Sequence, residues 1–402
     1  MDPKRERGRG VLVVSRIHMP EAAAASFRLR AVERALVELG VPVRVLTAKP
    51  PKGTPIADDP GVEVLRRPVL RDSSGYVRGY VPYLSFDLPL ALRLLAVRRP
   101  SVVLVEPPPT TGLVARAILA LRRIPYVWYA PDVWSDATEA IGAPVLVRRV
   151  VRWMESTAMR GAREVVAINE DVAERARALG GRDVRVVPNG IDTDLFSLDG
   201  PVPSAEERAR LGVGERYFVY AGTASEWQGA EVFIEALARV RDVDPELQIV
   251  FLGQGSAWPA LKEAAARLPH SPSGRPSVVF VPSLPPAEAA AWQRGALAAL
   301  VSIIPGIGYD FAYPTKVLAA LGCGTPVVYS GVGGASEDIA AHSLGRAVAH
   351  EAGEVAEAMI AALRGPADAR ERERMRAWVL ENRSIRVAGD RVARILLEGG
   401  AH

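Results

Sequence analysis

The chain has 402 residues, of which 49% are hydrophobic and 24% charged, so it can bury sizeable cores and is long enough for roughly two or three domains. Its single cysteine, Cys323, excludes an intramolecular disulfide, and its five histidines have no metal-ligand spacing. A formal net charge of +4 does not indicate a nucleic-acid partner. Since no apolar run is long enough for a signal peptide or for the roughly 20 residues of a membrane span, we expect a cytoplasmic protein without a structural metal.

Strand-like apolar runs alternate with helical patterns through the first half, which is typical of parallel α/β sheets. Val11–Val14 predicts a buried strand, and the apolar residues of 27–39 recur at helical spacing before Gly40. The further strands expected here are 41–47, 102–105, 126–129, 164–168 and 184–187, and the helices are 112–121, 145–160 and 171–179.

The alternation breaks between Phe196 and Gly214, where Gly200, Pro201 and Pro203 indicate a linker. A second α/β set follows, with strands expected at 217–221, 248–252, 278–281, 298–302 and 326–329, and helices at 228–240, 258–267, 286–294 and 314–321. We therefore predict two doubly wound Rossmann-like domains, 1–196 and 215–382, that face each other across a cleft. The linker is 197–214, and a C-terminal helix over 383–402 could cross back to the first domain.

Two glycine-containing turns follow consecutive strands of the second set. Ala221–Gly229 joins a strand to a helix, and 251–255 ends the next strand in the same way. Glycine allows a close approach of the backbone to a ligand, and free amides at a helix start favour an anion. An ordinary strand-to-helix turn is the alternative for each turn.

Two further segments lie at the same predicted edge. Tyr313-Pro-Thr-Lys316 begins a helix, where a lysine is unfavourable for the helix dipole unless an anion offsets it. Ser330-Gly-Val-Gly-Gly334 is a flexible turn after a strand. The alternative for Lys316 is a solvated surface lysine.

These segments resemble the motifs of glycosyltransferase family 4. Pro314-x-Lys316 followed by Ala320-x-Gly322-x-Gly324-Thr-Pro326 is similar to the donor-site segment of that family. The same holds for Gly222-Thr223 with Gln228-Gly229, and Val187-Pro-Asn-Gly-Ile-Asp192 resembles the signature at the end of its first domain. The resemblance covers nearly the whole chain and is closest to a bacterial subgroup of polysaccharide and cell-envelope assembly.

The resemblance implies the GT-B fold and retaining transfer of a sugar from a nucleoside diphosphate, without an obligatory metal or other cofactor. The acceptor would be a saccharide, a lipid-linked or a small molecule, and the sugar a hexose or an N-acetylhexosamine. Lys316 would be catalytic by supplying charge to the leaving diphosphate. The implied donor-binding residues are Gly222, Thr223, Gln228, Gly229, Gly253, Gly255, Tyr313, Pro314, Thr315, Lys316, Gly333 and Gly334.

The chain departs from the family pattern at two pairs of positions. Thr223 and Gln228 stand where many members carry an arginine and a lysine. Phe311 and Ala319 stand where many members carry a glutamate pair, of which the second holds the ribose hydroxyls. An inactive partner subunit of the same fold is therefore one alternative, and a nucleotide-sugar epimerase is another, although the latter depends on histidines that are scarce here.

The first domain supplies the candidates for the acceptor side of the cleft. Asp132 follows a strand, so its carboxylate could act catalytically by orienting an acceptor hydroxyl or the donor sugar, and Glu106 is a weaker candidate of the same kind. The other acceptor or cleft residues expected are Arg28, Arg30, Asp136 and Asn189. Helix capping for the aspartates and solvation for the arginines are the alternatives.

One predicted helix has the pattern of a peripheral membrane element. Residues 145–160 place Arg148, Arg149 and Arg152 on one face and apolar residues opposite, and 90–99 is similar. Such helices could bring the enzyme to the inner face of the cell membrane and to a lipid-linked acceptor. Packing of the apolar face on the domain's own sheet is the alternative.

Overall fold

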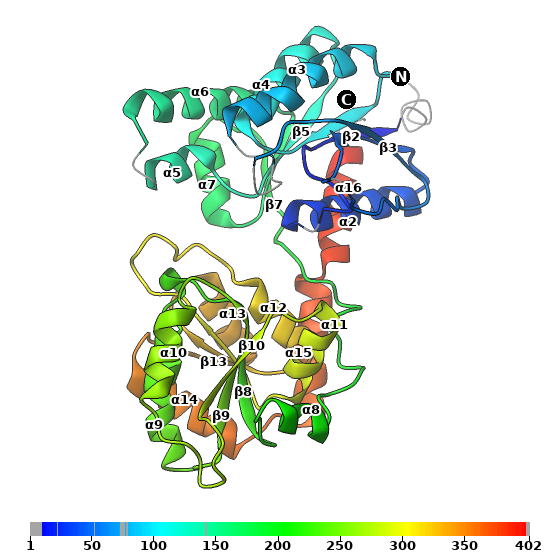
Figure 1. The fold of residues 1–402 in the computed structure, drawn as a ribbon. Helices are drawn as coiled ribbons and strands as arrows, with labels where there is room; N and C mark the ends of the chain where they lie inside the picture. Colours follow the sequence, from blue (N-terminus) through cyan, green and yellow to red (C-terminus); the bar gives the residue numbers. More distant parts are fainter. Residues whose placement is uncertain are drawn as a thin grey trace. The chain divides into compact units, whose positions relative to one another are not determined.

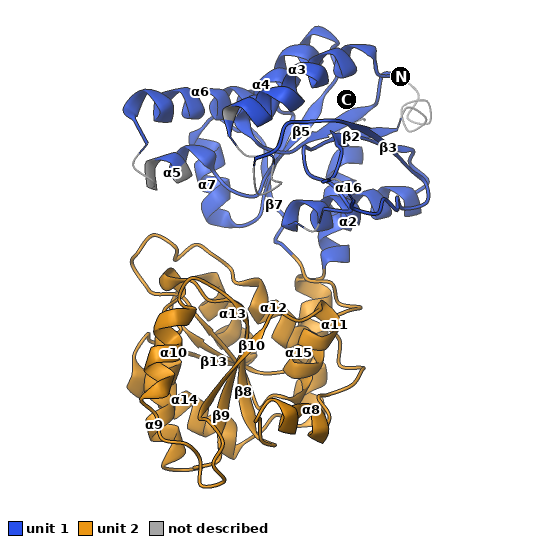
Figure 2. Ribbon diagram, in the orientation of Figure 1, with its two compact units in different colours: residues 1–189, 385–402 blue, residues 190–384 orange. Residues whose placement is uncertain are grey.

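The computed structural model describes residues 10–21, 23–51, 53–72, 77, 79–140 and 143–398. The chain forms two compact units, shown in different colours in Figure 2. Unit 1 comprises 1–189 together with 385–402, and unit 2 comprises 190–384. Among the described residues, no helix combines the length and the apolar character that a membrane crossing requires.

Unit 1 contains a seven-stranded parallel sheet in the order β3-β2-β1-β4-β5-β6-β7 (Figure 1). Its central strands are runs of buried valine and leucine, as expected for strands that are covered on both faces. The strands are β1 (Val11–Val14), β2 (Val43–Ala48), β3 (Val62–Arg67), β4 (Val102–Val105), β5 (Tyr126–Ala130), β6 (Glu164–Ala167) and β7 (Val184–Val186).

Helices cover both faces of this sheet. One core contains buried residues of α3 (Tyr80–Ala96), α4 (Pro109–Leu121), α6 (Val145–Gly161) and α7 (Glu170–Ala178). The core of the other face is formed with α2 (Ala24–Glu38) and α16 (Ile385–Glu398). A Cβ at Gly389 of α16 would lie 2.5 Å from the carbonyl of Ala31, so the absence of a side chain there lets α16 pack closely on α2. A short helix, α5 (Trp134–Ala140), follows β5.

Unit 2 contains a six-stranded parallel sheet in the order β10-β9-β8-β11-β12-β13. One core contains buried residues of α9, α10 and α14, and the other contains those of α11, α12, α13 and α15. The strands are β8 (Tyr217–Thr223), β9 (Gln248–Gln254), β10 (Val278–Pro282), β11 (Ala299–Ser302), β12 (Val327–Ser330) and β13 (Gly345–Val348). The helices are α8 (Ala205–Arg210), the 3-10 turn η1 (Glu226–Gln228), α9 (Glu231–Arg241), α10 (Trp258–Ala266), α11 (Pro286–Gly295), α12 (Thr315–Gly322), α13 (Gly334–His342), α14 (Ala352–Arg364) and α15 (Ala369–Asn382).

The predicted strands are all present, with bounds that differ by at most two residues, and the expectation of two parallel α/β sheets is confirmed. The segment 197–214, interpreted as a linker, instead lies within unit 2. It contains α8, and Arg294 donates hydrogen bonds to the carbonyls of Ser197 and Pro201. The C-terminal helix spans 385–398 as α16 and belongs to unit 1, whereas 399–402 lie outside the described residues.

Candidate functional site

Each sheet has one point at which the strand order reverses. In unit 2 the chain runs outward from β8 through β9 to β10, then returns to β11 beside β8 and runs outward the other way. In unit 1 the same reversal lies between β1 and β4. Ligands of such sheets bind at the carboxyl ends of the strands beside the reversal. Both reversals carry residues that the sequence singled out.

Lys316 is held at the reversal of unit 2. It is the second residue of α12, whose N-cap is Pro314, so it lies among amides that have no partner within the helix. Its ammonium donates to the hydroxyl of Tyr220 and to the carbonyl of Thr223, both at 2.8 Å. These two hydrogen bonds connect the start of α12 to the end of β8.

The surroundings of Lys316 disfavour its charge. The residue is half-buried, and the ammonium lies 4.0 Å from the centre of the Tyr220 ring. Desolvation lowers the pKa of Lys316 to about 7. Both hydrogen-bond partners are neutral oxygens, so an anion at this edge would stabilise the protonated form and be stabilised by it.

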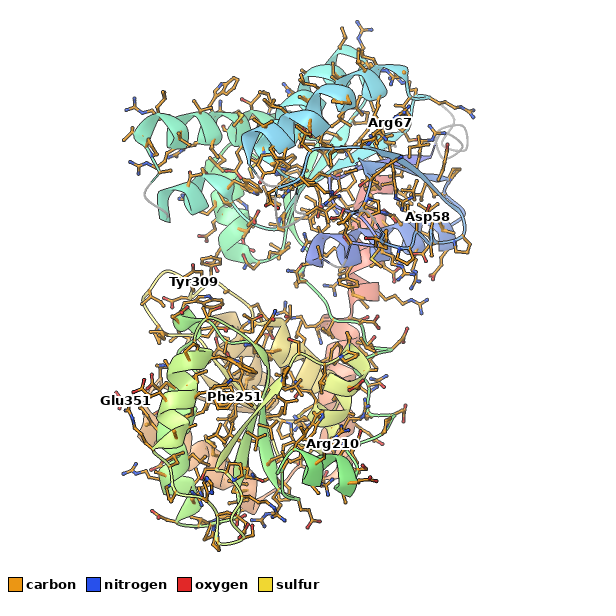
Figure 3. The ribbon with its side chains drawn as sticks, in the orientation of Figure 1. Asp58, Arg67, Arg210, Phe251, Tyr309 and Glu351 are labelled. Atoms are coloured by element: carbon orange, nitrogen blue, oxygen red, sulfur yellow. The ribbon has the colours of Figure 1, made fainter. Side chains whose placement is uncertain are left out.

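Tyr220 connects Lys316 to the turn that follows β8. Its hydroxyl donates to Oε1 of Gln228 at 3.2 Å, and the same oxygen accepts the backbone amide of Ser225 at 3.0 Å. The Tyr220 ring is buried against Phe251 of β9, which Figure 3 labels within the body of unit 2. Gln228 is therefore a buried residue that shapes the turn.

Close contacts and positive φ angles explain why several positions at this edge are glycine. A Cβ at Gly253 would lie 2.2 Å from the carbonyl oxygen of Gly222, and one at Gly255 would lie 1.9 Å from that of Ala224. These two glycines thus permit the close approach of β9 to β8. Gly222 itself has φ +114°, and a Cβ there would be 3.7 Å from Cε of Lys316. Gly229 adopts the left-handed conformation at the end of η1.

The segment 303–314 between β11 and α12 lies against the same turns. Tyr309, labelled in Figure 3, stacks on Trp227 of η1 with ring centres 4.6 Å apart. The carboxylate of Asp310 accepts a hydrogen bond from the amide of Gly306. A Cβ on Gly333 would lie 2.1 Å from the carbonyl oxygen of Asp310. Gly333 and Gly334, at the start of α13, therefore lie beside this segment.

Tyr313 and Phe311 belong to the same segment, and Ala319 lies in the helix α12 that follows it. The Tyr313 hydroxyl donates to Asp338 at 2.9 Å, and the same carboxylate accepts from Arg383 at 2.6 Å. Phe311 is half exposed, whereas Ala319 is buried in α12. Thr315 is exposed beside Lys316.

The structure therefore gathers the predicted donor-binding residues at one edge of unit 2. The sequence reasoning missed Tyr220, Trp227, Tyr309 and His350, whose Nδ1 lies 2.9 Å from Oγ of Ser330. Aromatic residues scattered along the chain give no spacing signal. A recess of about 290 Å³ in unit 2 is lined by Pro326, which precedes β12, and by Gly345, which begins β13, so it is not part of this site.

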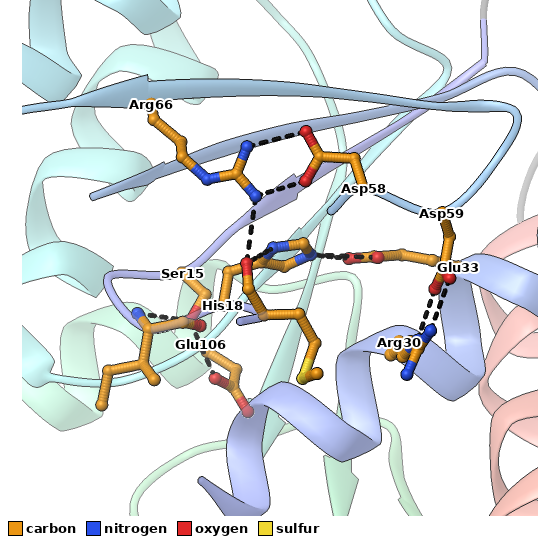
Figure 4. Close-up of polar contacts among 10 residues, drawn as sticks. Ser15, His18, Arg30, Glu33, Asp58, Asp59, Arg66 and Glu106 are labelled. Atoms are coloured by element: carbon orange, nitrogen blue, oxygen red, sulfur yellow. Dashed lines mark hydrogen bonds and ion pairs between the residues drawn. The ribbon is translucent and has the colours of Figure 1, made fainter. Parts of the chain in front are cut away.

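The reversal in unit 1 carries a buried polar cluster. Ser15 follows β1 and donates to Glu106, which follows β4, at 3.0 Å. Arg28 of α2 donates to the other oxygen of Glu106 at 3.0 Å, and both side chains are almost fully buried. Glu106, a weaker candidate from sequence, is thus the central residue of this cluster, and Figure 4 shows its contact with Ser15.

Asp132 follows β5, the next strand, and lies beside the cluster. Desolvation raises the pKa of Asp132, and the charge of Arg28 partly opposes this. The residue is nonetheless accessible to solvent. Arg16, which the sequence reasoning missed, lies over the Tyr83 ring at 4.8 Å, and burial lowers its pKa.

Two other predicted acceptor-side residues, Arg30 and Asp136, pair with charged residues outside the Glu106 cluster. Arg30 pairs with Asp59 at 2.5 and 2.6 Å, beside a buried pair of His18 and Glu33 (Figure 4). Asp136 pairs with Arg175 at 2.6 Å, so it belongs to the surface of α5 and α7. Asn189 is the last residue of the first segment of unit 1 and is half-buried.

We find no group of three or more histidine, cysteine, aspartate or glutamate residues that could hold a metal ion among the described residues. At the described donor-side edge, Lys316 supplies a positive charge.

Two family descriptions match the chain in succession. Residues 24–190 match the glycosyl transferase 4-like domain, and residues 215–365 match the glycosyl transferases group 1. A D-inositol 3-phosphate glycosyltransferase of Xylanimonas cellulosilytica is 31% identical over 180 residues. That alignment spans 42% of this chain and 41% of the relative.

Solved structures share the whole architecture. Sucrose-phosphate synthase from Thermosynechococcus elongatus has a TM-score of 0.68 at 19% identity, over 98% of this chain and 99% of that one. Anabaena Alr3699/HepE in complex with UDP-glucose has a TM-score of 0.63 at 18% identity, over 97% and 99%. With both domain descriptions in order and the fold shared from end to end, the chain belongs to glycosyltransferase family 4 and has the GT-B architecture.

Proposed function

We propose that the protein transfers a hexose or an N-acetylhexosamine, with retention of configuration, from a nucleoside-diphosphate sugar to a saccharide, a lipid-linked or a small-molecule acceptor. The observation that carries the proposal is the position of Lys316. It supplies a half-buried ammonium beside Gly222, at the strand reversal where ligands of such sheets bind. Anabaena Alr3699/HepE, which has the same fold, was solved with UDP-glucose.

The chemistry asked of unit 2 is stabilisation of the leaving diphosphate. As the bond from the anomeric carbon to the diphosphate oxygen breaks, negative charge grows on that oxygen. Lys316 and the free amides at the starts of α12 and α13 would hold this charge, which is usually the largest catalytic contribution of such a site. Because the protein itself supplies a cation, the proposed reaction needs no metal. Retention is proposed from the family alone.

The chemistry asked of unit 1 is orientation of the acceptor. Asp132 offers a solvent-accessible carboxylate at the carboxyl end of β5, beside the buried pair of Glu106 and Arg28. We propose that Asp132 accepts a hydrogen bond from the acceptor hydroxyl and that Glu106 and Arg28 fix its surroundings. Arg30 and Asp136, whose charges are paired elsewhere, are not part of this proposal.

A second candidate function is that of a partner subunit without transferase activity. Ala319 favours it, because this buried methyl group stands where many family members bind the ribose through a glutamate. An epimerase is less well supported, because at the described edges we find no histidine that is paired with a carboxylate and open to solvent. The pair of His18 and Glu33 is buried.

The experiment is a calorimetric titration of the protein with UDP-, GDP- and dTDP-sugars, followed by mass spectrometry of products made with candidate acceptors. Binding of one donor class and formation of a product heavier by one sugar residue supports the transferase. Absence of binding to every donor supports the inactive partner. We place the proposed reaction in the cytoplasm, with peripheral contact to the inner face of the membrane.

A further inference from the structure

Three helices form one layer on unit 1. Helix α4 packs against α3 on one side and α6 on the other, and Figure 1 shows the three along the same side of the sheet. Their inward side chains, among them Phe86, Leu90 and Met159, belong to one core. The outward face of this layer, here called the α3–α4–α6 face, is therefore defined by the side chains opposite that core.

The outward side of α3 is an uninterrupted apolar stripe. Leu84, Leu88, Leu92 and Leu95 recur every three or four residues and are all exposed, Leu92 to 70%. Leucines at this spacing lie on one side of a helix, opposite Leu90 and Leu94, which are fully buried. The stripe thus faces away from the core, which is unusual for the surface of a soluble unit.

Helix α6 continues the pattern with a tryptophan. Leu146 and Trp153 are exposed to 73% and 58%, seven residues apart on one side of the helix. Val150 is exposed beside them. A tryptophan with one apolar body and one polar N–H is typical of the boundary between water and lipid headgroups.

The charge of the same face has one sign. Helices α3, α4 and α6 contain two carboxylates in all, Asp87 and Glu155, and both are buried to 99%. Arg149 and Arg152 of α6, by contrast, are exposed. A face with leucines, a tryptophan and arginines but no exposed carboxylate is complementary to an anionic lipid surface. It would repel a second copy of itself.

A recess at the start of α6 could hold a phosphate group. It has a volume of about 180 Å³ and is lined by Ser135, Asp136, Val145, Arg148, Arg149 and Arg152. Asp136 already pairs with Arg175, so its charge is compensated within the protein. The arginines around the recess lie beside the exposed Leu146, as a headgroup phosphate lies beside an acyl chain.

We propose that the α3–α4–α6 face docks on an anionic phospholipid bilayer, with the leucine stripe and Trp153 in the interface and headgroup phosphates at Arg149 and Arg152. This deepens the peripheral contact of the proposed function and rests on it for its biological purpose. Its evidence is independent of the donor site, because it lies in the exposure and charge of unit 1 alone.

The test is co-sedimentation of the full chain with vesicles of phosphatidylcholine, with and without phosphatidylglycerol, in the absence of donor. We expect binding that requires phosphatidylglycerol. Two double variants, Arg149→Glu with Arg152→Glu and Leu88→Ser with Leu92→Ser, should each weaken binding by about tenfold or more. Arg210→Glu with Arg370→Glu, exposed arginines of unit 2, is the matched control and should bind as the parent does.

Three outcomes would contradict the proposed docking of the α3–α4–α6 face on an anionic bilayer. These are absence of sedimentation, equal binding to vesicles without phosphatidylglycerol, or unchanged binding of both variants when circular dichroism shows them folded. Displacement from vesicles by inorganic phosphate alone would assign the recess to a free phosphate. A dimer in sedimentation velocity that Leu88→Ser with Leu92→Ser dissolves would assign the leucines to a second copy. Transfer to a soluble acceptor, measured in parallel, shows separately whether the proposed function stands.

Discussion

The ammonium of Lys316 lies 2.8 Å from the hydroxyl of Tyr220 and 4.0 Å from the centre of the same ring. Residues 96 positions apart thus meet because β11, the strand that precedes α12 in the chain, neighbours β8 in the sheet. Tyr220 both accepts from Lys316 and donates to Gln228, so a fixed chain of hydrogen bonds positions Lys316. The proposed diphosphate site therefore depends on the buried Tyr220 as well as on Lys316.

Lys316→Ala should weaken binding of the nucleoside diphosphate by about 1–3 kcal/mol, the range for loss of a charge-assisted contact. Lys316→Arg should retain part of the affinity, since it keeps the charge while changing the geometry. Calorimetry with the donor nucleotide measures both. An alanine variant that binds as tightly as the parent would remove Lys316 from the site.

Donor binding should depend on pH through Lys316. The free protein holds the pKa of this lysine near 7, below its ordinary value, and a bound diphosphate raises it again. Affinity is therefore highest below about pH 7 and falls as pH rises, by up to about tenfold per pH unit until the pKa of the complex is reached. Titration of UDP from pH 6 to 9 tests this. Lys316→Ala is the control, because any slope that remains in it belongs to other groups.

Tyr220→Phe should loosen the site while keeping the core. The ring and its packing on Phe251 remain, but Lys316 loses one of its two acceptors and Gln228 loses a donor. We expect about 1–2 kcal/mol less stability and weaker donor binding. Urea unfolding and calorimetry report the two effects. A variant equal to the parent in both would show that the hydroxyl positions nothing.

The sequence predicts the fold well and the site only in part. Buried runs such as 11–14 and 102–105 have one plausible structure, so β1 and β4 are found at their observed bounds. Strand β3 was missed because it is half exposed and mostly charged on that side. Its place at the edge of the sheet depends on tertiary pairing with β2, which no local pattern reveals.

The sequence does not reveal which side chains of the site contact each other. Arg28 and Arg30 are two residues apart in one predicted helix, yet one meets Glu106 and the other meets Asp59. On a helix, such positions point in different directions. Gly222 and Lys316 could be assigned together from motifs, whereas Tyr220 required the structure, because its hydroxyl meets residues on two other segments, η1 and α12.

Gly253→Ala should disrupt the edge at which the donor is proposed to bind. The new Cβ would lie 2.2 Å from the carbonyl oxygen of Gly222, and φ is +147°. Gly274→Ala is the matched control in the same unit, because its φ is also positive but nothing lies within 4 Å of the new atom. The control should lose about 1 kcal/mol of stability, and Gly253→Ala clearly more. Equal thermal unfolding of the two variants would contradict the close approach of β8 and β9.

Glu106 should contribute more to the stability of the protein than an exposed carboxylate does. Its side chain is 4% exposed and that of Arg28 10%, and the two groups are 3.0 Å apart. Glu106→Ala leaves the Arg28 charge buried without its partner, which typically costs about 3–5 kcal/mol. Glu106→Gln keeps an acceptor for Arg28 and for Ser15, so it should cost less while removing the negative charge beside Asp132. The exposed pair of Arg267 and Glu263 provides the comparison, since Glu263→Ala should cost less than about 1 kcal/mol. Denaturant unfolding of the three variants measures the difference in stability. A Glu106→Ala protein as stable as Glu263→Ala would contradict the prediction. It would mean that water reaches the Arg28 guanidinium, so that the cluster at the carboxyl ends of β1 and β4 is open rather than packed.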